Sequence, residues 1–400
     1  MYLGPSFVEI NLDAIGHNVR EVRKLIGEHR RFMAVVKGDA YGHGAVLVAR
    51  VALDNGATDL GVTNLMEAIE LRNAGITAPI MVLGSILPEE AELAAEAGVT
   101  VAVWQLEVVQ ALNWAARRSR DKVKVHIEVN TGLNRFGLRP TAVPEFLETV
   151  RELDSIEVEG IFTHFSAATA GNLKLTRRQL TIFMDLVAEL ASEGIAIPIK
   201  HAANSEAAIL LPESRLDMVR IGNLLYGRAG VETKLPLLDP WKLKSKVVSI
   251  TEVKAGEGVS YGPIFRARRD MRIAVLPVGY SDGVGMEPVS RTLRFVYMVK
   301  VMVACLANWL GMPAGRFSPT RGLIWSEYGE LPVVGRITMQ QTLVDVTYLP
   351  EVEAGTPVTI EARRIAVSAR LPKVFVAEGR VVSRQGTREL SENGTVQVSE

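Results

Sequence analysis

The sequence predicts an α/β protein in which an N-terminal (β/α)8 barrel of the TIM type is followed by a mostly-β domain. Three observations support this fold class. Eight short apolar, β-branched runs alternate with helical patterns over residues 32–221. After Gly227 the pattern changes to short alternating strand signals without helices between them. Reactive side chains stand at the ends of several runs, as the active face of such a barrel requires.

The first part of the chain contains the barrel pattern. Phe7–Asn11 predicts a short strand, and Asp13 is expected to cap a helix that ends near Ile26. The eight strand candidates are Phe32–Val36, Leu60–Thr63, Ile80–Leu83, Val99–Val103, Val123–Val129, Gly160–His164, Ile197–His201 and Met218–Ile221. The helical patterns between most of them are Asn64–Asn73, Pro88–Glu96, Leu106–Arg117, Ala142–Leu153, Arg178–Ser192 and Ser205–Leu211.

This alternation implies right-handed crossovers and a parallel sheet. Eight repeats favour a closed barrel over an open, doubly wound sheet. No Gly-x-Gly-x-x-Gly follows the first run, which weakens the dinucleotide-binding alternative.

The second part of the chain predicts a β domain. Its strand signals are Leu243–Ile250, Arg272–Val278, Pro332–Val334, Leu343–Thr347, Pro357–Ile360 and Val374–Val376, with glycines between them. We therefore expect a barrel over residues 1–234, a mostly-β domain over 235–382, and a polar, partly disordered tail over 383–400.

Composition excludes several function classes. The chain has 400 residues, 48% of them hydrophobic, and 45 basic residues balance 45 acidic ones. That balance gives no global field for nucleic acid or an anionic membrane. A single cysteine, Cys305, suits a reducing cytoplasm, and Met1–Asn11 lacks the features of a signal peptide. Phe295–Met312 is mostly apolar but contains Lys300 and Asn308, so we expect a buried or interface segment instead of a membrane span.

The run Phe32–Val36 ends in a lysine, Lys37, followed by a glycine-rich stretch. A buried ammonium is costly, so such lysines often have a depressed pKa or form Schiff bases with carbonyl compounds such as pyridoxal phosphate. Taken alone, Lys37 is better explained as a strand-end lysine that reaches solvent. Other reactive residues, however, also stand at strand ends on the expected barrel mouth: Glu128, Arg135, His164, Asn204, Ser205 and Arg220.

Several segments resemble the alanine racemase family, and they occur in the order found in that family. The first is Val35-Val36-Lys37-x-x-Ala40-Tyr41-Gly42-His43-Gly44. The others are His126-Ile-Glu128-Val-Asn-Thr-Gly-Leu-Asn-Arg135-Phe-Gly137, Thr163-His164-Phe165, His201-Ala-Ala-Asn204-Ser205, Val219-Arg220-Ile-Gly222-Asn223-Leu-Leu-Tyr226-Gly227, Val259-Ser260-Tyr261-Gly262, Gly279-Tyr280-Ser-Asp282-Gly283 and Gly335-Arg336-Ile-Thr-Met339-Gln340-Gln341. Any one of these is weak evidence, but their shared order from about residue 8 to 346 is specific.

The resemblance implies an isomerase with pyridoxal phosphate attached to Lys37 and no metal. It also implies interconversion of L- and D-alanine, a cell-wall precursor, with Lys37 and Tyr261 as proton-transferring groups on opposite faces. An unassisted phenol is a poor base at neutral pH. The family places a histidine and an arginine behind its tyrosine, and His164 and Arg220 match them.

The remaining implied roles concern the cofactor and the substrate. Arg220 would face the pyridine nitrogen and keep it unprotonated, because a guanidinium does not give up its proton readily. The positions matching the cofactor-binding residues are Tyr41, Asn204, Ser205, Gly222 and Asn223. Arg135 and the backbone amide of Met339 match groups that hold the substrate carboxylate, and Tyr280 would line the entrance. Since the family's tyrosine comes from a second subunit, the resemblance implies a homodimer with shared active sites.

The chain departs from the family pattern at several positions. Glu128 replaces a lysine that is often carbamylated, so its carboxylate is expected to orient Arg135 directly. Gln340 replaces an aspartate, and Thr359-Ile360-Glu361-Ala362 lies where the family has Ile-Pro-Tyr-Glu, which suggests a wider or rebuilt entrance. The segment 293–328 is longer than its family counterpart and apolar, and its sequence assigns it no role.

These departures leave the substrate open. Alanine racemisation is the leading hypothesis, and a broader amino-acid racemase acting on serine, lysine or similar substrates is the alternative. A non-catalytic pyridoxal-phosphate-binding protein and a decarboxylase on a related architecture are further alternatives.

Overall fold

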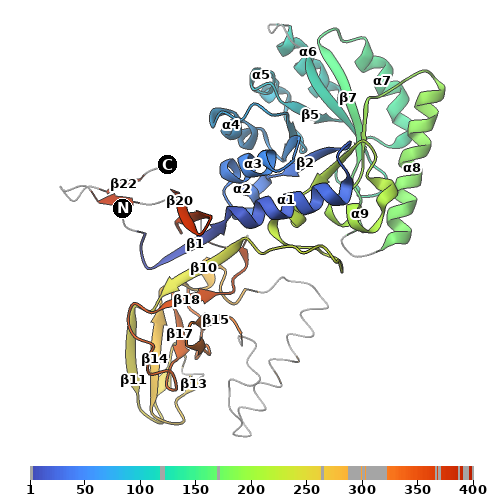
Figure 1. Ribbon diagram of the computed structural model, residues 1–400. Coiled ribbons are helices and arrows are strands. Elements are labelled where there is room, and N and C mark those ends of the chain that lie inside the picture. Colours follow the sequence, from blue (N-terminus) through green and yellow to red (C-terminus); the bar gives the residue numbers. More distant parts are fainter. Residues whose placement is uncertain are drawn as a thin grey trace. The chain divides into compact units, whose positions relative to one another are not determined.

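The computed structural model describes residues 3–117, 122–168, 172–262, 265–286, 322–364, 371–385, 388–390 and 396–398, and single positions 299, 302 and 367. Two compact units make up the chain. One unit is Leu12–Pro240, and the other combines Met1–Asn11 with Trp241–Glu400. Figure 1 shows the first in blue to yellow-green and most of the second in yellow to red.

The first unit is a closed, parallel, eight-stranded barrel, as the sequence predicts. Each strand pairs with the next, and β9 pairs with β2 through registers such as Phe32 with Val219, which closes the barrel. The strands are β2 (Arg31–Val35), β3 (Asp59–Val62), β4 (Ile80–Val82), β5 (Thr100–Val103), β6 (Val123–Val129), β7 (Ile156–Thr163), β8 (Ile199–His201) and β9 (Met218–Ile221). Their residues are almost all buried, as expected for parallel strands covered on both faces.

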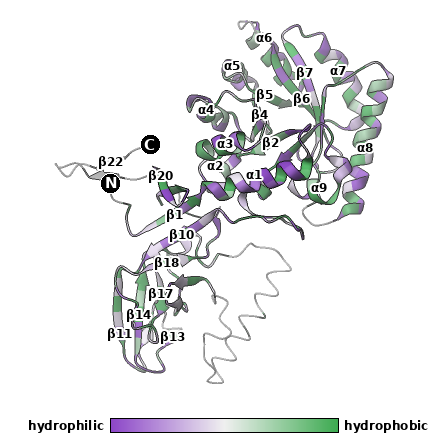
Figure 2. Ribbon diagram, in the orientation of Figure 1, coloured by the Kyte–Doolittle hydropathy of each residue, from purple (hydrophilic) through white to green (hydrophobic). Residues whose placement is uncertain are grey.

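One helix, α1 (Leu12–Ile26), precedes the first barrel strand, and the other helices of this unit follow barrel strands. These are α2 (Lys37–Gly42), α3 (Ala45–Asp54), α4 (Leu65–Asn73), α5 (Ala91–Glu96), α6 (Leu106–Ala116), α7 (Val143–Arg151), α8 (Leu173–Ser192) and α9 (Ser205–Leu210), with short 3-10 turns η1 (Pro88–Glu90), η2 (Pro140–Ala142), η3 (Pro212–Ser214) and η4 (Asn223–Tyr226). Hydrophobic and hydrophilic residues alternate along α1 and α8, so each helix can bury one side (Figure 2). None of the helices in the described ranges is long and apolar enough to cross a membrane.

Asparagine side chains fix where three of these helices begin. Asn64, Asn172 and Asn204 precede α4, α8 and α9, and each side chain accepts a hydrogen bond from the backbone N–H three residues later. This N-cap satisfies one of the donors that a helix leaves unpaired at its start. The cap at Asn204 holds the chain where β8 ends at the barrel mouth.

The second unit contains a mixed seven-stranded sheet in the order β16-β15-β18-β10-β1-β19-β20. These strands are β1 (Ser6–Asn11), β10 (Trp241–Lys246), β15 (Ile324–Ser326), β16 (Gly329–Glu330), β18 (Pro357–Ile360), β19 (Lys373–Ala377) and β20 (Arg380–Gln385). Smaller sheets contain β11 (Ser249–Val253), β14 (Met271–Leu276) and β17 (Thr342–Asp345), then β12 (Gly258–Val259) and β13 (Phe265–Arg266), then β21 (Arg388–Leu390) and β22 (Val396–Val398). A short 3-10 turn, η5 (Tyr280–Asp282), follows β14.

The strand predicted at Phe7–Asn11 exists, but it belongs to the β unit, whereas the predicted barrel range began at residue 1. It lies between β10, with which it is antiparallel, and β19, with which it is parallel. In Figure 1 the dark-blue β1 lies beside the yellow β10. The boundaries between the two units in the sequence are therefore Asn11–Leu12 and Pro240–Trp241.

Other strand expectations in the β unit are refined by the structure. Leu243–Ile250 is two strands, β10 and β11, separated by a break at residues 247–248. Pro332–Val334 forms no strand, and only an isolated bridge joins Val333 to Val344. Residues 293–321 of the apolar segment lie outside the described residues, except positions 299 and 302. This range includes the whole of Phe295–Met312.

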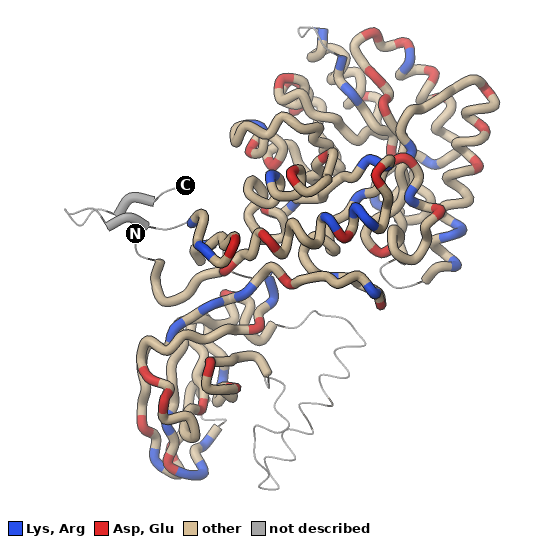
Figure 3. Tube along the Cα trace, viewed as in Figure 1, with Lys and Arg blue, Asp and Glu red and all other residues tan. Residues whose placement is uncertain are grey.

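The tail expected from residue 383 onward is described only in part. Residues 383–385 belong to β20, while positions 386–387, 391–395 and 399–400 lie outside the described residues. Basic and acidic residues are interspersed along the elements of both units (Figure 3), in keeping with the balanced composition.

Candidate active site

A cavity of about 440 Å³ lies at the mouth of the barrel, where the strands end. It is lined by every site residue that the sequence predicts on the barrel: Lys37, Tyr41, Glu128, Arg135, His164, Asn204, Ser205, Arg220, Gly222 and Asn223. These residues come from the carboxyl ends of five different strands and from the segments after them, which is how barrel enzymes assemble their sites. The structure therefore brings the predicted barrel residues together in one place.

Lys37 stands two residues beyond the end of β2, with its side chain partly buried in this cavity. Its Nζ lies 6.0 Å from the centre of the Tyr41 ring. Burial lowers the pKa of Lys37, the positive charge of Arg135 lowers it further, and the carboxylate of Glu67 opposes the change. A larger fraction of the amine is therefore neutral, which suits a nucleophile or a proton acceptor.

The backbone after Lys37 makes a left-handed turn. Gly38, Asp39, Ala40 and Tyr41 all have φ between 52° and 60°, although α2 was expected neither as a helix nor as a turn of this hand. Each non-glycine residue in this conformation costs about 1–2 kcal/mol. Local hydrogen bonds offset part of that cost, because Asp39 Oδ1 accepts from the Ala45 N–H at 2.7 Å and the Ala40 N–H donates to the Val36 carbonyl at 2.8 Å. The turn directs Tyr41 into the same cavity as Lys37.

Glu67 on α4 supports this turn, and it was not among the predicted site residues. Its Oε1 accepts from the Gly38 N–H at 2.5 Å, and its Oε2 accepts from the Thr63 N–H at 2.9 Å. The spacing Asn64-x-x-Glu67 is that of a capping box, which was the available signal. Glu67 therefore ties the loop after Lys37 to the loop after β3.

A cradle for an anion lies in the same cavity, formed by Tyr41, Ser205, Gly222 and Asn223. The Gly222 N–H donates to Ser205 Oγ at 3.1 Å. A Cβ on Gly222 would lie 2.7 Å from Tyr41 Oη, so only glycine leaves room for the phenol here. Hydroxyl groups and adjacent backbone N–H groups in a concave site suit a phosphate.

Tyr41 is held in place by its packing. Its ring lies 4.8 Å from the ring of Tyr226, whose hydroxyl donates to the Val35 carbonyl at 2.9 Å. Burial, and then the negative charge of Glu206, raise the pKa of Tyr41 to about 12. Tyr41 therefore stays a neutral hydrogen-bond donor at physiological pH.

Arg220 on β9 is 4% exposed and makes several hydrogen bonds. Its Nη1 lies 2.7 Å from His201 Nδ1, and its Nη2 donates to the carbonyls of Thr163 at 2.8 Å and Ala202 at 3.1 Å. Nη2 also lies 3.3 Å from His164 Nδ1. These contacts fix the guanidinium at the cavity floor beside His164.

The charges around Arg220 are mutually dependent. Burial raises the pKa of Glu128 to about 7, although the charges of Arg220 and Arg135 oppose this rise. Burial also lowers the pKa of Arg220 to about 10, with Glu128 opposing the change. Burial and the charge of Arg220 lower the pKa of His164 to about 3, so the His164 imidazole is neutral.

The structure does not pair Glu128 with Arg135 in the way that the sequence analysis expects. Glu128 Oε2 is buried, and among the described residues it has no hydrogen-bond partner. The guanidinium of Arg135 instead lies over the Phe136 ring, 5.3 Å from its centre, and Phe136 stacks on Trp104 at 4.8 Å. The carboxylate therefore acts on Arg135 through the local field, and its free oxygen is available to a ligand.

The β unit contains a second cavity, of about 960 Å³, which gathers the predicted residues Tyr261, Tyr280 and Met339. Tyr261 is 74% exposed, so its ring is available to a second molecule. Gln340 and Arg336 also line this cavity, and Arg336 was not assigned a role from the sequence. The two cavities belong to separate compact units.

The loops that carry these β-unit residues are fastened to each other. Ser260, directly before Tyr261, has a φ of 67° and donates from Oγ to the Arg336 carbonyl at 3.0 Å. The Tyr280 N–H donates to the Thr338 carbonyl at 3.0 Å. A Cβ on Gly279 would lie 2.1 Å from that Thr338 carbonyl, which explains the glycine.

The departures near the C-terminus fall within the β unit. Gln340 lines the cavity of Tyr261, and the Glu361 N–H donates to the Leu323 carbonyl at 2.7 Å at the end of β18. No group of three or more His, Cys, Asp or Glu side chains that could hold a metal ion occurs in the parts of the chain that the structure describes.

A partly buried lysine with a lowered pKa, beside an anion cradle at the mouth of a closed barrel, is suited to an enzyme site in which the amine reacts with a carbonyl compound. Residues 10–229 match the model of the family "Alanine racemase, N-terminal domain", and residues 241–304 match "Alanine racemase, C-terminal domain". The chain belongs to the alanine racemase family, which confirms the resemblance.

Individual relatives agree with this assignment. The chain is 37% identical over 361 residues to an alanine racemase of Methanococcus maripaludis, covering 89% of this chain and 88% of that protein. The solved alanine racemase of Clostridium difficile 630 superimposes with a TM-score of 0.83 at 29% identity, covering 96% and 99% of the two chains. A histidine racemase of Leuconostoc mesenteroides subsp. sake is also similar, with a TM-score of 0.78, 26% identity and coverage of 93% and 98%.

Proposed function

We propose that this chain is a pyridoxal-phosphate-dependent alanine racemase that interconverts L- and D-alanine. The observation that carries the proposal is the barrel-mouth cavity, where Lys37, Arg220 and the anion cradle meet in a member of this family. Its relatives are named as alanine racemases over most of the chain length. The residue roles proposed below combine this cavity with the cavity of the β unit and with the family pattern.

The residues present fit pyridoxal phosphate. The cradle offers the hydroxyls of Tyr41 and Ser205 and backbone N–H groups at Gly222 and Asn223 to a phosphate, and a Cβ at Gly222 would fill it. Lys37 reaches the same cavity with a lowered pKa, as attachment to an aldehyde requires. Arg220 and Asn204 line the same cavity, and we assign Arg220 to the ring nitrogen and Asn204 to the cofactor-binding residues.

Bound pyridoxal phosphate would supply an electron sink that makes the Cα hydrogen of an amino acid removable. Lys37 Nζ accepts or returns that proton on one face of the substrate. Tyr261 Oη does the same on the other face, because inversion requires the proton to leave one side and return on the opposite one. His164, neutral beside Arg220, supports the tyrosine.

Two residues hold the substrate carboxylate, and a third sets the local charge. Arg135 binds the substrate carboxylate through its guanidinium, and Met339 contributes its backbone N–H. Glu128 lies between two arginines and keeps this part of the site from becoming strongly cationic. Arg220 keeps its own proton, so it does not protonate the ring nitrogen, and Tyr280 lines the entrance.

We also propose that the protein is a homodimer with shared active sites. Tyr261 is exposed on its own β unit, and Lys37 lies in the barrel unit. A C2 dimer would let Tyr261 of one subunit serve Lys37 of the other. Sedimentation or light scattering of the purified holoenzyme tests this, and mixing Lys37→Ala with Tyr261→Phe subunits should restore one intact site per mixed dimer.

A broader-specificity amino-acid racemase is the second candidate. Two observations favour keeping it: the similarity to a histidine racemase and the departures at Gln340 and Glu361 in the β unit. Initial rates with L-alanine, L-serine, L-lysine and L-histidine separate the two. A larger substrate with a higher kcat/KM than alanine would overturn the alanine assignment.

The deciding experiment incubates purified protein with L-alanine and pyridoxal phosphate and follows D-alanine by chiral chromatography. D-alanine should accumulate until the enantiomers are equal, and Lys37→Ala should form none. If the protein shows the visible cofactor band but forms neither D-alanine nor the D-form of any other amino acid tested, it is a non-catalytic pyridoxal-phosphate-binding protein.

A further inference from the structure

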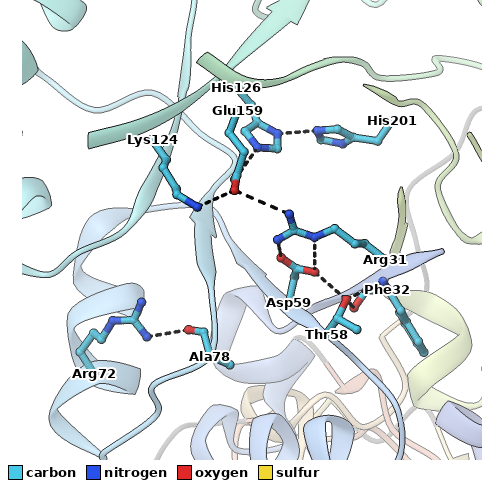
Figure 4. A network of polar contacts seen from close by, with 10 residues as sticks. All are labelled: Arg31, Phe32, Thr58, Asp59, Arg72, Ala78, Lys124, His126, Glu159 and His201. Carbon is cyan, nitrogen blue, oxygen red and sulfur yellow. Dashed lines mark hydrogen bonds and ion pairs between the residues drawn. The ribbon is translucent and has the colours of Figure 1, made fainter. Parts of the chain in front are cut away.

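A continuous row of polar side chains leads from Arg220 into the interior of the barrel. Arg220 Nη1 lies 2.7 Å from His201 Nδ1, His201 Nε2 lies 2.8 Å from His126 Nδ1, and His126 Nε2 lies 3.1 Å from Glu159 Oε2. Figure 4 shows the part of this row from His201 to Glu159, with the side chains pointing toward one another. His201 is fully buried and His126 is 2% exposed.

The hydrogens in this row can point in only one direction. A guanidinium has no acceptor, so Arg220 donates and His201 Nδ1 accepts. A neutral imidazole carries its single proton on the other nitrogen, so His201 Nε2 donates to His126 Nδ1. His126 Nε2 then donates to Glu159, which as a carboxylate can only accept. Burial lowers the pKa of both histidines, so the neutral forms that this order requires are favoured.

Glu159 anchors the far end of the row. It accepts from Lys124 Nζ at 2.7 Å and lies 3.7 Å from Arg31 Nη1, which is itself paired with Asp59. Hydrogen bonding to His126, followed by the bond to Lys124, lowers the pKa of Glu159 to about 2 despite its partial burial. The end of the row therefore carries a fixed negative charge on β7, away from the mouth.

These contacts also determine which Arg220 donors remain for the cavity. A guanidinium has five N–H groups. The Thr163 and Ala202 carbonyls occupy Nη2, and His201 takes one proton of Nη1. Among the described residues no partner of Arg220 Nε is recorded, so the Nε–H and the second Nη1–H are the groups available to a ligand.

We propose that Glu159, acting through His126 and His201, is a positioning residue that holds Arg220 as a donor and aims its remaining N–H groups at the cofactor. This inference rests on the proposed function, in which Arg220 faces the ring nitrogen. The negative end strengthens the acceptor His201 Nδ1 and so helps Arg220 to keep its proton. Removal of that charge weakens the row and changes the group that the cofactor meets.

A purely structural role explains the row less well. The neighbouring barrel interior is filled by apolar side chains, including Met33, Met81 and Phe162, so apolar residues can pack there. Burying two imidazoles and an arginine without need costs free energy, and replacement by packed apolar groups is often neutral or stabilising. Phe162 stacks on His201 at 4.7 Å and lies 5.1 Å from the Arg220 guanidinium, which further restricts both.

The test uses the full-length holoenzyme with Glu159→Gln, which keeps the shape but removes the charge. Its control is Lys124→Met, which removes a partner of the same carboxylate without interrupting the row. We expect Glu159→Gln to shift the visible absorption band of bound pyridoxal phosphate and to lower kcat about 10-fold, a typical effect of losing a supporting partner. Alanine KM should change little. The melting temperature of Glu159→Gln should fall, because the carboxylate also pairs with Lys124 and Arg31, and Lys124→Met should keep the native band and kcat.

A folded Glu159→Gln enzyme with an unchanged band and an unchanged kcat overturns the proposal. If this variant does not fold, His126→Leu provides the same test, since leucine cannot link His201 to Glu159 while His201 can still accept from Arg220. The band is recorded without substrate. A native protein that binds the cofactor but does not racemise alanine would overturn the proposed function, and the band would still test the role of Glu159. Absence of any band in the native protein would overturn both proposals.

Discussion

Replacement of Gly222 by alanine tests the anion cradle directly. The new Cβ would lie 2.7 Å from Tyr41 Oη and 3.2 Å from its Cζ. Ordinary contact begins at 3.4 Å, so the phenol must retreat by about 0.7 Å. The ring cannot move freely, because Tyr226 packs against it at 4.8 Å.

A retreat of this size would lengthen a hydrogen bond from Tyr41 to a phosphate oxygen beyond the usual range. Hydrogen bonds to charged groups contribute about 1.5–3 kcal/mol. Gly222→Ala should therefore weaken pyridoxal phosphate binding by about 10- to 150-fold. The dissociation constant is measured by titrating the apoprotein with the cofactor and following the visible band, with thermal unfolding of the apoprotein as a check on folding.

The double variant Gly222→Ala/Tyr41→Phe provides the matched control. Removing the hydroxyl also removes the closest contact, so adding Gly222→Ala to a Tyr41→Phe background should cost much less than adding it to the native chain. Equal costs in the two backgrounds, or a Gly222→Ala protein that binds as the native chain does, would refute the assignment of Tyr41 and Gly222 to one cradle.

Three further substitutions have defined outcomes. Tyr261→Phe should lower racemisation by about 100-fold or more, the usual contribution of a general acid–base group. Exchange of the α-hydrogen of one enantiomer with deuterated solvent should continue, because Lys37 is intact. A near-native rate of racemisation would contradict the role of Tyr261. Burial raises the pKa of Glu128 from 4.5 to about 7, so the folded apoprotein holds this proton more tightly and loses stability as the pH rises through that window. Glu128→Gln should therefore unfold at a higher temperature than the native apoprotein above about pH 7 and at a similar temperature near pH 4, and calorimetry that finds no pH-dependent difference would contradict this. Gly279→Ala would bring a Cβ within 2.1 Å of the Thr338 carbonyl, so denaturant titration should find a loss of about 3 kcal/mol, whereas a neutral result would mean that the loop tolerates rearrangement.

Much of the barrel could be predicted because its signals are local. Apolar runs of four to eight residues recur between helical patterns, and parallel strands buried on both faces leave that imprint in the sequence. The mouth residues could be located for a related reason. Once the strands are counted, the residues at and directly after their carboxyl ends must share one end of the barrel, as Glu128, His164 and Arg220 do.

Features that depend on distant pairing or on strain could not be predicted. The left-handed turn at Asp39–Tyr41 contradicts the preference of non-glycine residues, and hydrogen bonds to Glu67 and from the Ala45 N–H help to hold it. The row of His126 and His201 was visible only as two histidines within recognised motifs. Its direction depends on contacts among strands that the sequence separates by tens of residues.

The position of β1 was missed for the same reason, and it affects how the protein is made. Phe7 pairs with Lys244 in β10, and Ile10 pairs with Phe375 in β19, so the whole barrel is an insertion between neighbouring strands of one sheet. At a synthesis rate of about 5–20 residues per second, β1 leaves the ribosome roughly 20–70 seconds before β19 exists. During that interval the barrel can close and β10 becomes available to one edge of β1, while the edge that pairs with β19 stays unpaired. The need for chaperones during synthesis should therefore be sensitive to changes in the first eleven residues. Deleting these residues would also remove β1 from the middle of a sheet and separate β10 from β19.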